Sequence, residues 1–128
     1  MTGVARYLDL ARAGHHDGAL EGLVELGEPA LPALIEAYRA DADPVVRALV
    51  VEAIWQLRTH ASIDFLAEAL QDPDAIVWKQ VLDGLVTLAS PESLRVLEGA
   101  RDRIGEDREA FREWVDGAID DVSGRIDE

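Results

Sequence analysis

The sequence predicts an all-α protein, a short α-solenoid of about four antiparallel helix pairs. Apolar residues recur at the spacing of one helical face, and this pattern repeats about every 31 residues. The apolar–polar alternation typical of β-strands is absent. The 128 residues suit one domain, expected to cover positions 1–128. A single helix pair cannot bury its apolar face alone, so the pairs are expected to stack.

The longer helix of each pair carries the clearest repeat. Val46, Val50 and Ile54 share one helical face, because residues three and four positions apart are neighbours on a helix. The complete run is Val46, Val50, Ala53, Ile54 and Leu57, and it recurs as His15, Ala19, Gly22, Leu23 and Leu26, as Val77, Val81, Gly84, Leu85 and Leu88, and, after a spacing of 30, as Phe111, Trp114, Val115 and Ala118. Ala or Gly at the third position of the first three copies indicates a close approach of two helices.

The shorter helices follow the same period. Residues 30–34 align with residues 62–66 and 93–97, and the weakest match is the first helix, near residues 3–13. Proline stands at the predicted starts in Glu28-Pro29, Asp43-Pro44 and Ser90-Pro91, and Asp72-Pro73-Asp74 is expected to open another helix. Ser62 and Ser93 occupy matching places at helix starts, which favours a capping role over that of a nucleophile.

At this point the chain resembles a known family. The segment Asp43-Pro44-Val45-Val46-Arg47, followed by Val50, Ala53-Ile54 and Leu57, is similar to the HEAT-repeat pattern of an Asp-Pro turn, Val-Arg, Ala-Leu and Leu. Residues 27–34 resemble the helix start of a HEAT-like subclass first associated with phycobilisome lyases. The resemblance extends over residues 19–100. It implies a right-handed curl with the shorter A helices outside and the longer B helices lining the concave side.

One family feature is interrupted in this chain. In HEAT repeats the Arg that Arg47 represents tends to pair with a neighbouring acid. Trp78 stands at that place one unit later, and His16 stands there one unit earlier. The resemblance therefore implies an incomplete ladder of Arg–acid pairs.

The charge balance favours a basic protein as partner. Twenty-six acids face twelve bases, for a formal net charge of −14 at pH 7. Such a surface repels nucleic acids and anionic membranes and attracts basic proteins, although acidity also serves solubility alone. The chain has no cysteine, its N-terminus lacks a signal-peptide pattern, and no stretch reaches the roughly 18 apolar residues of a membrane span. We therefore expect a cytoplasmic protein.

No motif for catalysis or cofactor binding is recognised. His15 and His16 are adjacent and point about 100° apart on a helix, so they do not share a face, whereas a metal site prefers His at i and i+4. The chain has no His-Glu dipeptide and no glycine-rich phosphate-binding loop. A metal site, a cofactor and catalytic residues are not expected.

A repeated acidic position on the B helices is the candidate site. If Val50, Ala53 and Ile54 face the core, Glu52 points outward. The equivalent outward positions in the other three B helices also hold acids. The predicted partner-binding residues are Glu21, Glu52, Asp83 and Glu113, with Val24, Trp55, Val86 and Asp116 beside them and Glu25 and Gln56 one turn on. Acids among apolar residues and a Trp are typical of a binding surface for a basic partner. They are also compatible with an ordinary solvated face, in which Trp55 packs on a neighbouring helix.

Three classes of function remain open. The chain is short and strongly acidic, and residues 74–79 and 82–88 resemble small HEAT-like proteins that accompany bacterial toxin genes. The leading hypothesis is a non-catalytic binding module, an immunity protein that occludes a basic, nuclease-like toxin. A general scaffold or adaptor is the alternative, and a bile-pigment lyase-like enzyme is a further one. The oligomeric state stays open.

Overall fold

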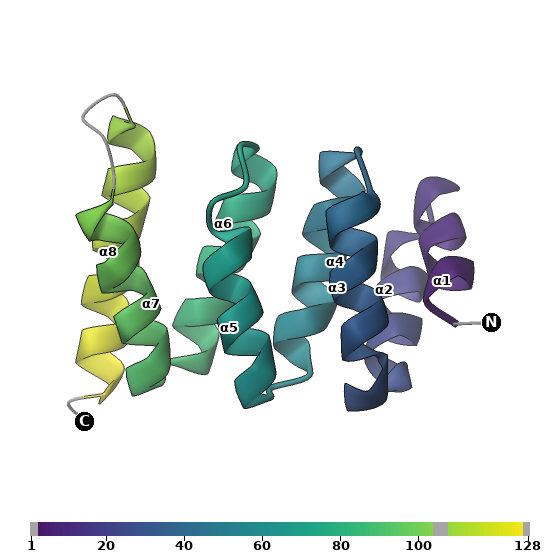
Figure 1. Ribbon diagram of the computed structural model, residues 1–128, viewed down its shortest axis with the longest axis horizontal. Helices are drawn as coiled ribbons and strands as arrows, with labels where there is room; N and C mark the ends of the chain where they lie inside the picture. Colours follow the sequence, from purple (N-terminus) through teal and green to yellow (C-terminus); the bar gives the residue numbers. More distant parts are fainter. Residues whose placement is uncertain (1–2, 104–107, 127–128) are drawn as a thin grey trace.

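The computed structural model describes residues 3–103 and 108–126, which form eight α-helices joined by short links (Figure 1). The helices are α1 (Gly3–Arg12), α2 (His16–Leu26), α3 (Leu31–Ala40), α4 (Pro44–Gln56), α5 (His60–Ala69), α6 (Ala75–Leu88), α7 (Pro91–Asp102) and α8 (Glu109–Ile126), and the 3₁₀ turn η1 (Glu28–Ala30) precedes α3. These residues contain no β-strand. The predicted all-α solenoid of four helix pairs is confirmed. We call the pairs units 1 to 4, and the contacts between successive units seams 1 to 3.

The helices form two layers. In Figure 1 the A helices α1, α3, α5 and α7 lie in front, and the B helices α2, α4, α6 and α8 lie behind. Each B helix contacts the B helix of the next unit. A cluster of buried apolar side chains holds the two layers together, and its fully buried members include Leu23, Leu34, Ile54, Leu66, Leu85 and Leu97. Within the described ranges, no helix is both long and apolar enough to cross a membrane.

Side-chain caps explain where several helices begin. The carboxylate of Asp43 accepts a hydrogen bond from the amide of Val45 at 2.9 Å, and Asp74 accepts one from Ile76 at 3.0 Å. These bonds satisfy amides of the first turn, which have no acceptor inside the helix. Pro44 and Pro91 stand in the first turns of α4 and α7, as predicted.

The capping role predicted for two serines is wrong, although the predicted start of α7 at Ser90-Pro91 is confirmed. Ser62 and Ser93 are not the caps. Their amides donate to the hydroxyls of the actual caps, Thr59 at 3.2 Å and Ser90 at 3.0 Å. The sequence alignment began at the first apolar match, which lies one turn inside each helix. Pro29 likewise falls in η1 and precedes α3.

A buried carboxylate joins units 2 and 3 at seam 2. Asp72, in the link between α5 and α6, is only 5% exposed. It accepts hydrogen bonds from Tyr38 Oη at 2.6 Å, from Arg47 Nε at 3.0 Å and Nη2 at 3.2 Å, and from the Asp74 amide at 2.9 Å. Arg47 also donates to two backbone carbonyls of the α3–α4 link, at 3.1 and 2.9 Å. The network therefore ties α3 and α4 to the next unit.

These hydrogen bonds determine which groups are ionised. Burial disfavours the carboxylate of Asp72, but the donors of Arg47, Tyr38 and the Asp74 amide outweigh burial and lower its pKa. Burial and the bond to Asp72 raise the pKa of Tyr38, so its hydroxyl stays protonated and donates. Asp72 is therefore a stable anion at neutral pH despite its burial.

Seam 1 contains an ion pair that the sequence did not predict. Asp41, 31 residues before Asp72, pairs with Arg12 at the end of α1. Arg12 supplies the guanidinium group that His16 lacks at the family position. The expected gap in the ladder is therefore filled here from a different helix.

Seam 3 has no such ion pair among the described residues. Trp78 packs edge-on against Phe111 and Trp114 of α8, with ring centroids 4.9 and 6.3 Å apart. Arg103 stands 31 residues after Asp72, so both members of the Arg–acid pair are replaced. Aromatic packing takes the place of the buried ionic network in this seam.

Two glycines let aromatic side chains lie against a neighbouring helix. A Cβ atom at Gly84 of α6 would lie 2.5 Å from Cγ of Trp55 in α4, and one at Gly22 would overlap the ring of Tyr7 in α1. Trp55 is held further by a hydrogen bond from its Nε1 to Oε1 of Gln80 at 2.8 Å. The close approach predicted from the repeat is confirmed at both glycines.

Replacing Asp72 with Ala should lower the free energy of unfolding by about 3 kcal/mol, because Arg47 and Tyr38 lose a shared buried acceptor. The matched control Glu68→Ala removes the exposed Arg39–Glu68 ion pair of the same seam and should cost less than about 1 kcal/mol. Urea unfolding at neutral pH measures both losses.

The pH dependence follows from the lowered pKa of Asp72. Its contribution is present above the ordinary value of 3.8 and is lost as the pH falls through the lowered pKa. The difference between wild type and Asp72→Ala should therefore shrink in acid. Equal losses for both variants at neutral pH would contradict the special role of the buried network.

Gly84→Ala should destabilise the protein by about 1–3 kcal/mol, because the new methyl group collides with Trp55. This loss exceeds the gain in helix propensity of about 1 kcal/mol. Gly117→Ala in α8 is the matched control, because nothing lies within 4 Å of its new Cβ, and it should stabilise by about 0.5–1 kcal/mol. Thermal unfolding reports both signs. If both variants are more stable than wild type, Trp55 moves aside at little cost and the prediction for Gly84→Ala is wrong.

Candidate functional site

The candidate site is the B face, defined as the side of α2, α4, α6 and α8 turned away from the A helices. Two hollows lie on it. The larger hollow, about 770 Å³, runs between α6 and α8 and reaches Trp55 of α4; we call it the α6–α8 groove. The smaller one, about 390 Å³, lies between α2 and α4. Both are lined by B-helix residues alone, so the B layer builds the site without help from the A helices.

Most of the predicted site residues line these hollows. Trp55, Asp83, Val86 and Glu113 line the α6–α8 groove, and Glu21, Val24, Glu25 and Gln56 line the smaller hollow. None of these side chains is fully buried. The structure thus brings the predicted residues to one face in two groups, and their role in partner binding stays a prediction.

Glu52 lies within the acidic row, at a place that disfavours its ionised carboxylate. Its side chain is half-buried, and Gln56 Nε2 donates to it at 3.3 Å. Burial raises the pKa of Glu52, and the negative charges of Asp83 and Asp17 raise it further. Asp17, one turn before Glu21 on α2, was not among the predicted residues. The row therefore holds like charges close enough to repel one another.

Trp55 is anchored in the fold. Its indole lies on Gly84, and its Nε1 donates a hydrogen bond to Oε1 of Gln80. It is half-buried and forms one end wall of the groove. The packing alternative that the sequence left open for Trp55 therefore describes most of its contacts.

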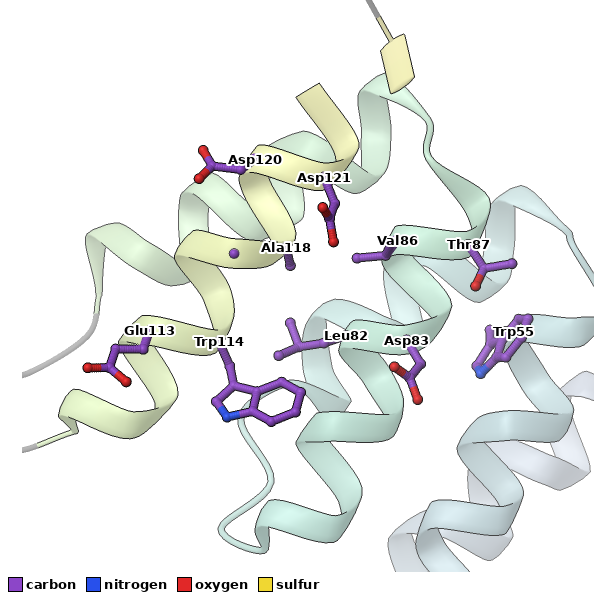
Figure 2. A pocket seen from close by; sticks show the side chains of 11 residues that line it. Trp55, Leu82, Asp83, Val86, Thr87, Glu113, Trp114, Ala118, Asp120 and Asp121 are labelled. Carbon is purple, nitrogen blue, oxygen red and sulfur yellow. The ribbon is translucent and has the colours of Figure 1, made fainter. Parts of the chain in front are cut away.

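Trp114 is the exposed aromatic residue of the groove. Its side chain is 47% exposed, and Nζ of Lys79 lies 4.7 Å from the ring centroid. Figure 2 shows the indoles of Trp114 and Trp55 on the two sides of Asp83, with Leu82 and Val86 between the walls. Two acids of α8 that the sequence did not single out, Asp120 and Asp121, also line the groove, and Asp121 points toward α6 (Figure 2).

The sequence missed Trp114 because of the register chosen for α8. A 30-residue spacing placed it at the position of Gly84, which faces a neighbouring helix. In the structure the buried residues of α8 are Phe111, Val115, Ala118 and Val122. Trp114 lies beside this stripe, and only the contact with α6 turns it into a wall of the groove.

The fourth member of the predicted row, Glu113, lines the same groove as Asp83. The carboxylate of Glu113 points away from Leu82 and Asp83, toward the other side of α8 (Figure 2). Asp116 is half-buried and forms an ion pair with Arg101 of α7 at 2.6 Å. On α8 the acids that line the groove are Glu113, Asp120 and Asp121.

The arrangement suits contact with a charged, amphipathic surface. It combines several carboxylates with an exposed indole and a partly apolar floor. In residues 3–103 and 108–126, no group of three or more His, Asp or Glu side chains is placed to hold a metal ion. The polar groups line open hollows and do not converge on a single point.

Comparison with known proteins supports this description. Residues 31–114 match the family model described as HEAT repeats. No curated protein and no solved structure shows a significant match to the chain. The matched segment runs from the start of α3 to Trp114 of α8 and covers more than half of the sequence. HEAT repeats generally serve as surfaces for protein–protein interaction. The stacked helix pairs of the chain and this match together show that the chain belongs to the HEAT-repeat family.

Proposed function

We propose that this HEAT-repeat protein is a non-catalytic module whose acidic B face binds a basic protein, and that it acts as an immunity protein. In this role it would cover the cationic, substrate-binding surface of a nuclease-like toxin effector. The single observation that carries the proposal is the row of carboxylates on the B face, in which Glu52 is half-buried and lies close enough to Asp83 and Asp17 for their charges to repel. A partner's Lys or Arg at this place relieves a repulsion that the free protein tolerates.

The groove adds an anchor to this electrostatic attraction. Charged surfaces raise association rates, whereas buried aromatic and Arg residues supply most of the affinity. Trp114 presents an exposed indole next to Leu82, Val86 and Ala118. The mechanism is therefore steering by the carboxylates, followed by burial of Trp114 against an apolar residue of the partner. Trp55 contributes a fixed wall and moves little.

An adaptor function is the second candidate, and one observation favours it. Val45 and Ile76 are 42% and 52% exposed, and they stand 31 residues apart at the starts of α4 and α6. Exposed aliphatic residues at one repeated position would bind a partner through contacts that salt does not weaken. An adaptor of this kind would assemble several proteins and would not inhibit one.

Glu52→Gln should raise the free energy of unfolding at pH 7 by up to about 1 kcal/mol while weakening the complex with a basic partner. The pKa of Glu52 is raised in the folded protein, so its ionisation costs stability at pH values above that pKa. The gain should vanish below the ordinary value of 4.5, where the carboxyl group is protonated in both states. Urea unfolding at pH 7 and pH 3 tests the sign.

The control for this prediction is Glu25→Gln, which removes an exposed charge from the same face. Glu25→Gln should leave stability nearly unchanged at both pH values. If Glu52→Gln destabilises the protein at pH 7, the strain on this row is absent and the proposal loses its main support.

The triple variant Glu21→Gln, Glu52→Gln, Asp83→Asn should fold normally and capture the partner poorly. With pull-downs from the native host at low and moderate salt, wild type should retain one dominant basic protein that is released as salt rises. The triple variant should associate with this basic protein about tenfold or more slowly than wild type at low salt, because electrostatic steering is reduced.

A matched control carries the same charge change on the A helices. Glu36, Asp64 and Glu98 are exposed on α3, α5 and α7, and their neutralisation should leave capture by the B face largely intact. If both triple variants lose capture of the partner equally, the effect comes from the net charge of the protein and not from the B face. Several partners that resist salt would favour the adaptor function.

A further inference from the structure

A separate hollow of about 420 Å³ lies at seam 3, outside the B face. It is formed between α5 and α7 and is closed on one side by Phe111 at the start of α8. Leu70 and Val96 supply apolar wall, and Ala67, Gly99 and Ala100 leave room because their side chains are small or absent. Its volume is within the range of small-molecule sites in proteins.

The repeat explains why this hollow exists. At seam 2 the same place is filled by Tyr38 packed edge-on against Phe65, with ring centroids 5.0 Å apart, and by the Arg39–Glu68 ion pair. The predicted alignment shifts α3 to α5 by 32 residues and α5 to α7 by 31. Tyr38 and Phe65 then correspond to Leu70 and Val96, and Arg39 and Glu68 correspond to Gln71 and Gly99. All four of these smaller replacements line the hollow.

The charge at this part of seam 3 is also opposite to the charge at the equivalent part of seam 2. The buried acid of seam 2, Asp72, corresponds to Arg103, and its partner Arg47 corresponds to Trp78, which packs on Phe111 and Trp114. Arg103 lines the hollow together with Arg95 and Arg108. Its Nη2 would lie 3.8 Å from a Cβ at Gly99, so its side chain folds back over α7. In a chain with a net charge of −14, three arginines gather around one apolar hollow.

These arginines form no ion pair at contact distance, although Arg95 lies near enough to Glu92 for the two charges to attract. No carboxylate of the described residues forms an ion pair with Arg95, Arg103 or Arg108. The guanidinium carbon of Arg108 lies 4.3 Å from the ring centroid of Phe111. Guanidinium groups bind carboxylate, phosphate and sulfonate groups through charge-assisted hydrogen bonds. Here they border an apolar wall, so one ligand can meet both.

We propose that this hollow, the seam-3 pocket, binds a small organic anion that carries a flat apolar group. The anionic group takes the place that the carboxylate of Asp72 occupies at seam 2 and meets Arg103 and Arg95. The apolar group fills the space of the missing Tyr38 and Phe65 rings, against Leu70, Val96 and Phe111. The proposal is independent of the partner bound by the B face, because the two sites share no lining residue.

The test uses 1-naphthyl phosphate as the probe and the full chain as the protein. In ¹H–¹⁵N spectra the probe should shift the amides of Ala67, Gly99 and Ala100 in a saturable way. Arg103→Gln and Arg95→Gln should each weaken binding by about tenfold, because a charge-assisted contact is lost. Ala67→Leu, which adds apolar bulk to the wall, should also weaken it. The uncharged 1-naphthalenemethanol should bind at least about tenfold more weakly than the phosphate.

Arg58→Gln is the matched control, because Arg58 is exposed at the opposite end of α5 and lines no part of this pocket. It changes the net charge equally and should leave probe binding unchanged. Dispersed spectra for every variant establish that folding is intact, since the replaced arginines are exposed. Three results would each overturn the proposal: no shifts at the pocket amides, equal binding of the uncharged analogue, or an equal loss with Arg58→Gln.

Discussion

The shared carboxylate of Asp72 is the constraint on which the middle of this protein depends. One anion receives donors from α3, from α4 and from the start of α6, so units 2 and 3 can meet in only one register. Burial makes an unpaired carboxylate costly, and the donors that compensate for burial are themselves directional. That register holds α4 against α6, which places Trp55 on Gly84 and brings Glu52 within electrostatic reach of Asp83. The geometry of the candidate binding face is thus decided on the opposite side of the helices that display it.

Local patterns in the sequence were sufficient to predict the helices and insufficient to predict the contacts at the seams. The 31-residue period, the prolines at helix starts and the small residues at Gly22 and Gly84 all act within a few turns, so they can be read from spacing. Arg12 pairs with an acid 29 positions away on another unit, which no spacing rule within a repeat could indicate. Trp114 was assigned to the wrong side of α8 because the last helix departs from the period of the others. The acidic row was predicted in outline: Glu113 lines the groove with its carboxylate pointing away from Asp83, and Asp121, which the sequence did not single out, points toward α6.

The acidic surface of the protein has an energetic cost. Net acidity costs a compact domain some self-repulsion, and at Glu52 burial disfavours the charged carboxylate as well. Surfaces that bind often retain such local instability, because a partner removes it on contact. Arginines gather on another side of the same molecule, at the seam-3 pocket, although acids outnumber bases by more than two to one. Hollows lined by side chains of opposite charge are therefore separated on a chain of only 128 residues.

The three seams differ in chemistry, and this difference limits how the architecture can evolve. Seam 1 uses an ion pair from α1, seam 2 uses a buried anion with a tyrosine, and seam 3 uses aromatic rings. Solenoids commonly lengthen by duplicating an internal repeat whose two edges match. A second copy of unit 3 inserted here would present Trp78 to Asp72 and Leu70 to Phe65, so Asp72 would lack the donors that Arg47 and Tyr38 supply at seam 2. Each unit of this protein therefore fits only its present neighbours. A descendant would more readily acquire new binding properties by point substitution on the existing faces than by addition of repeats.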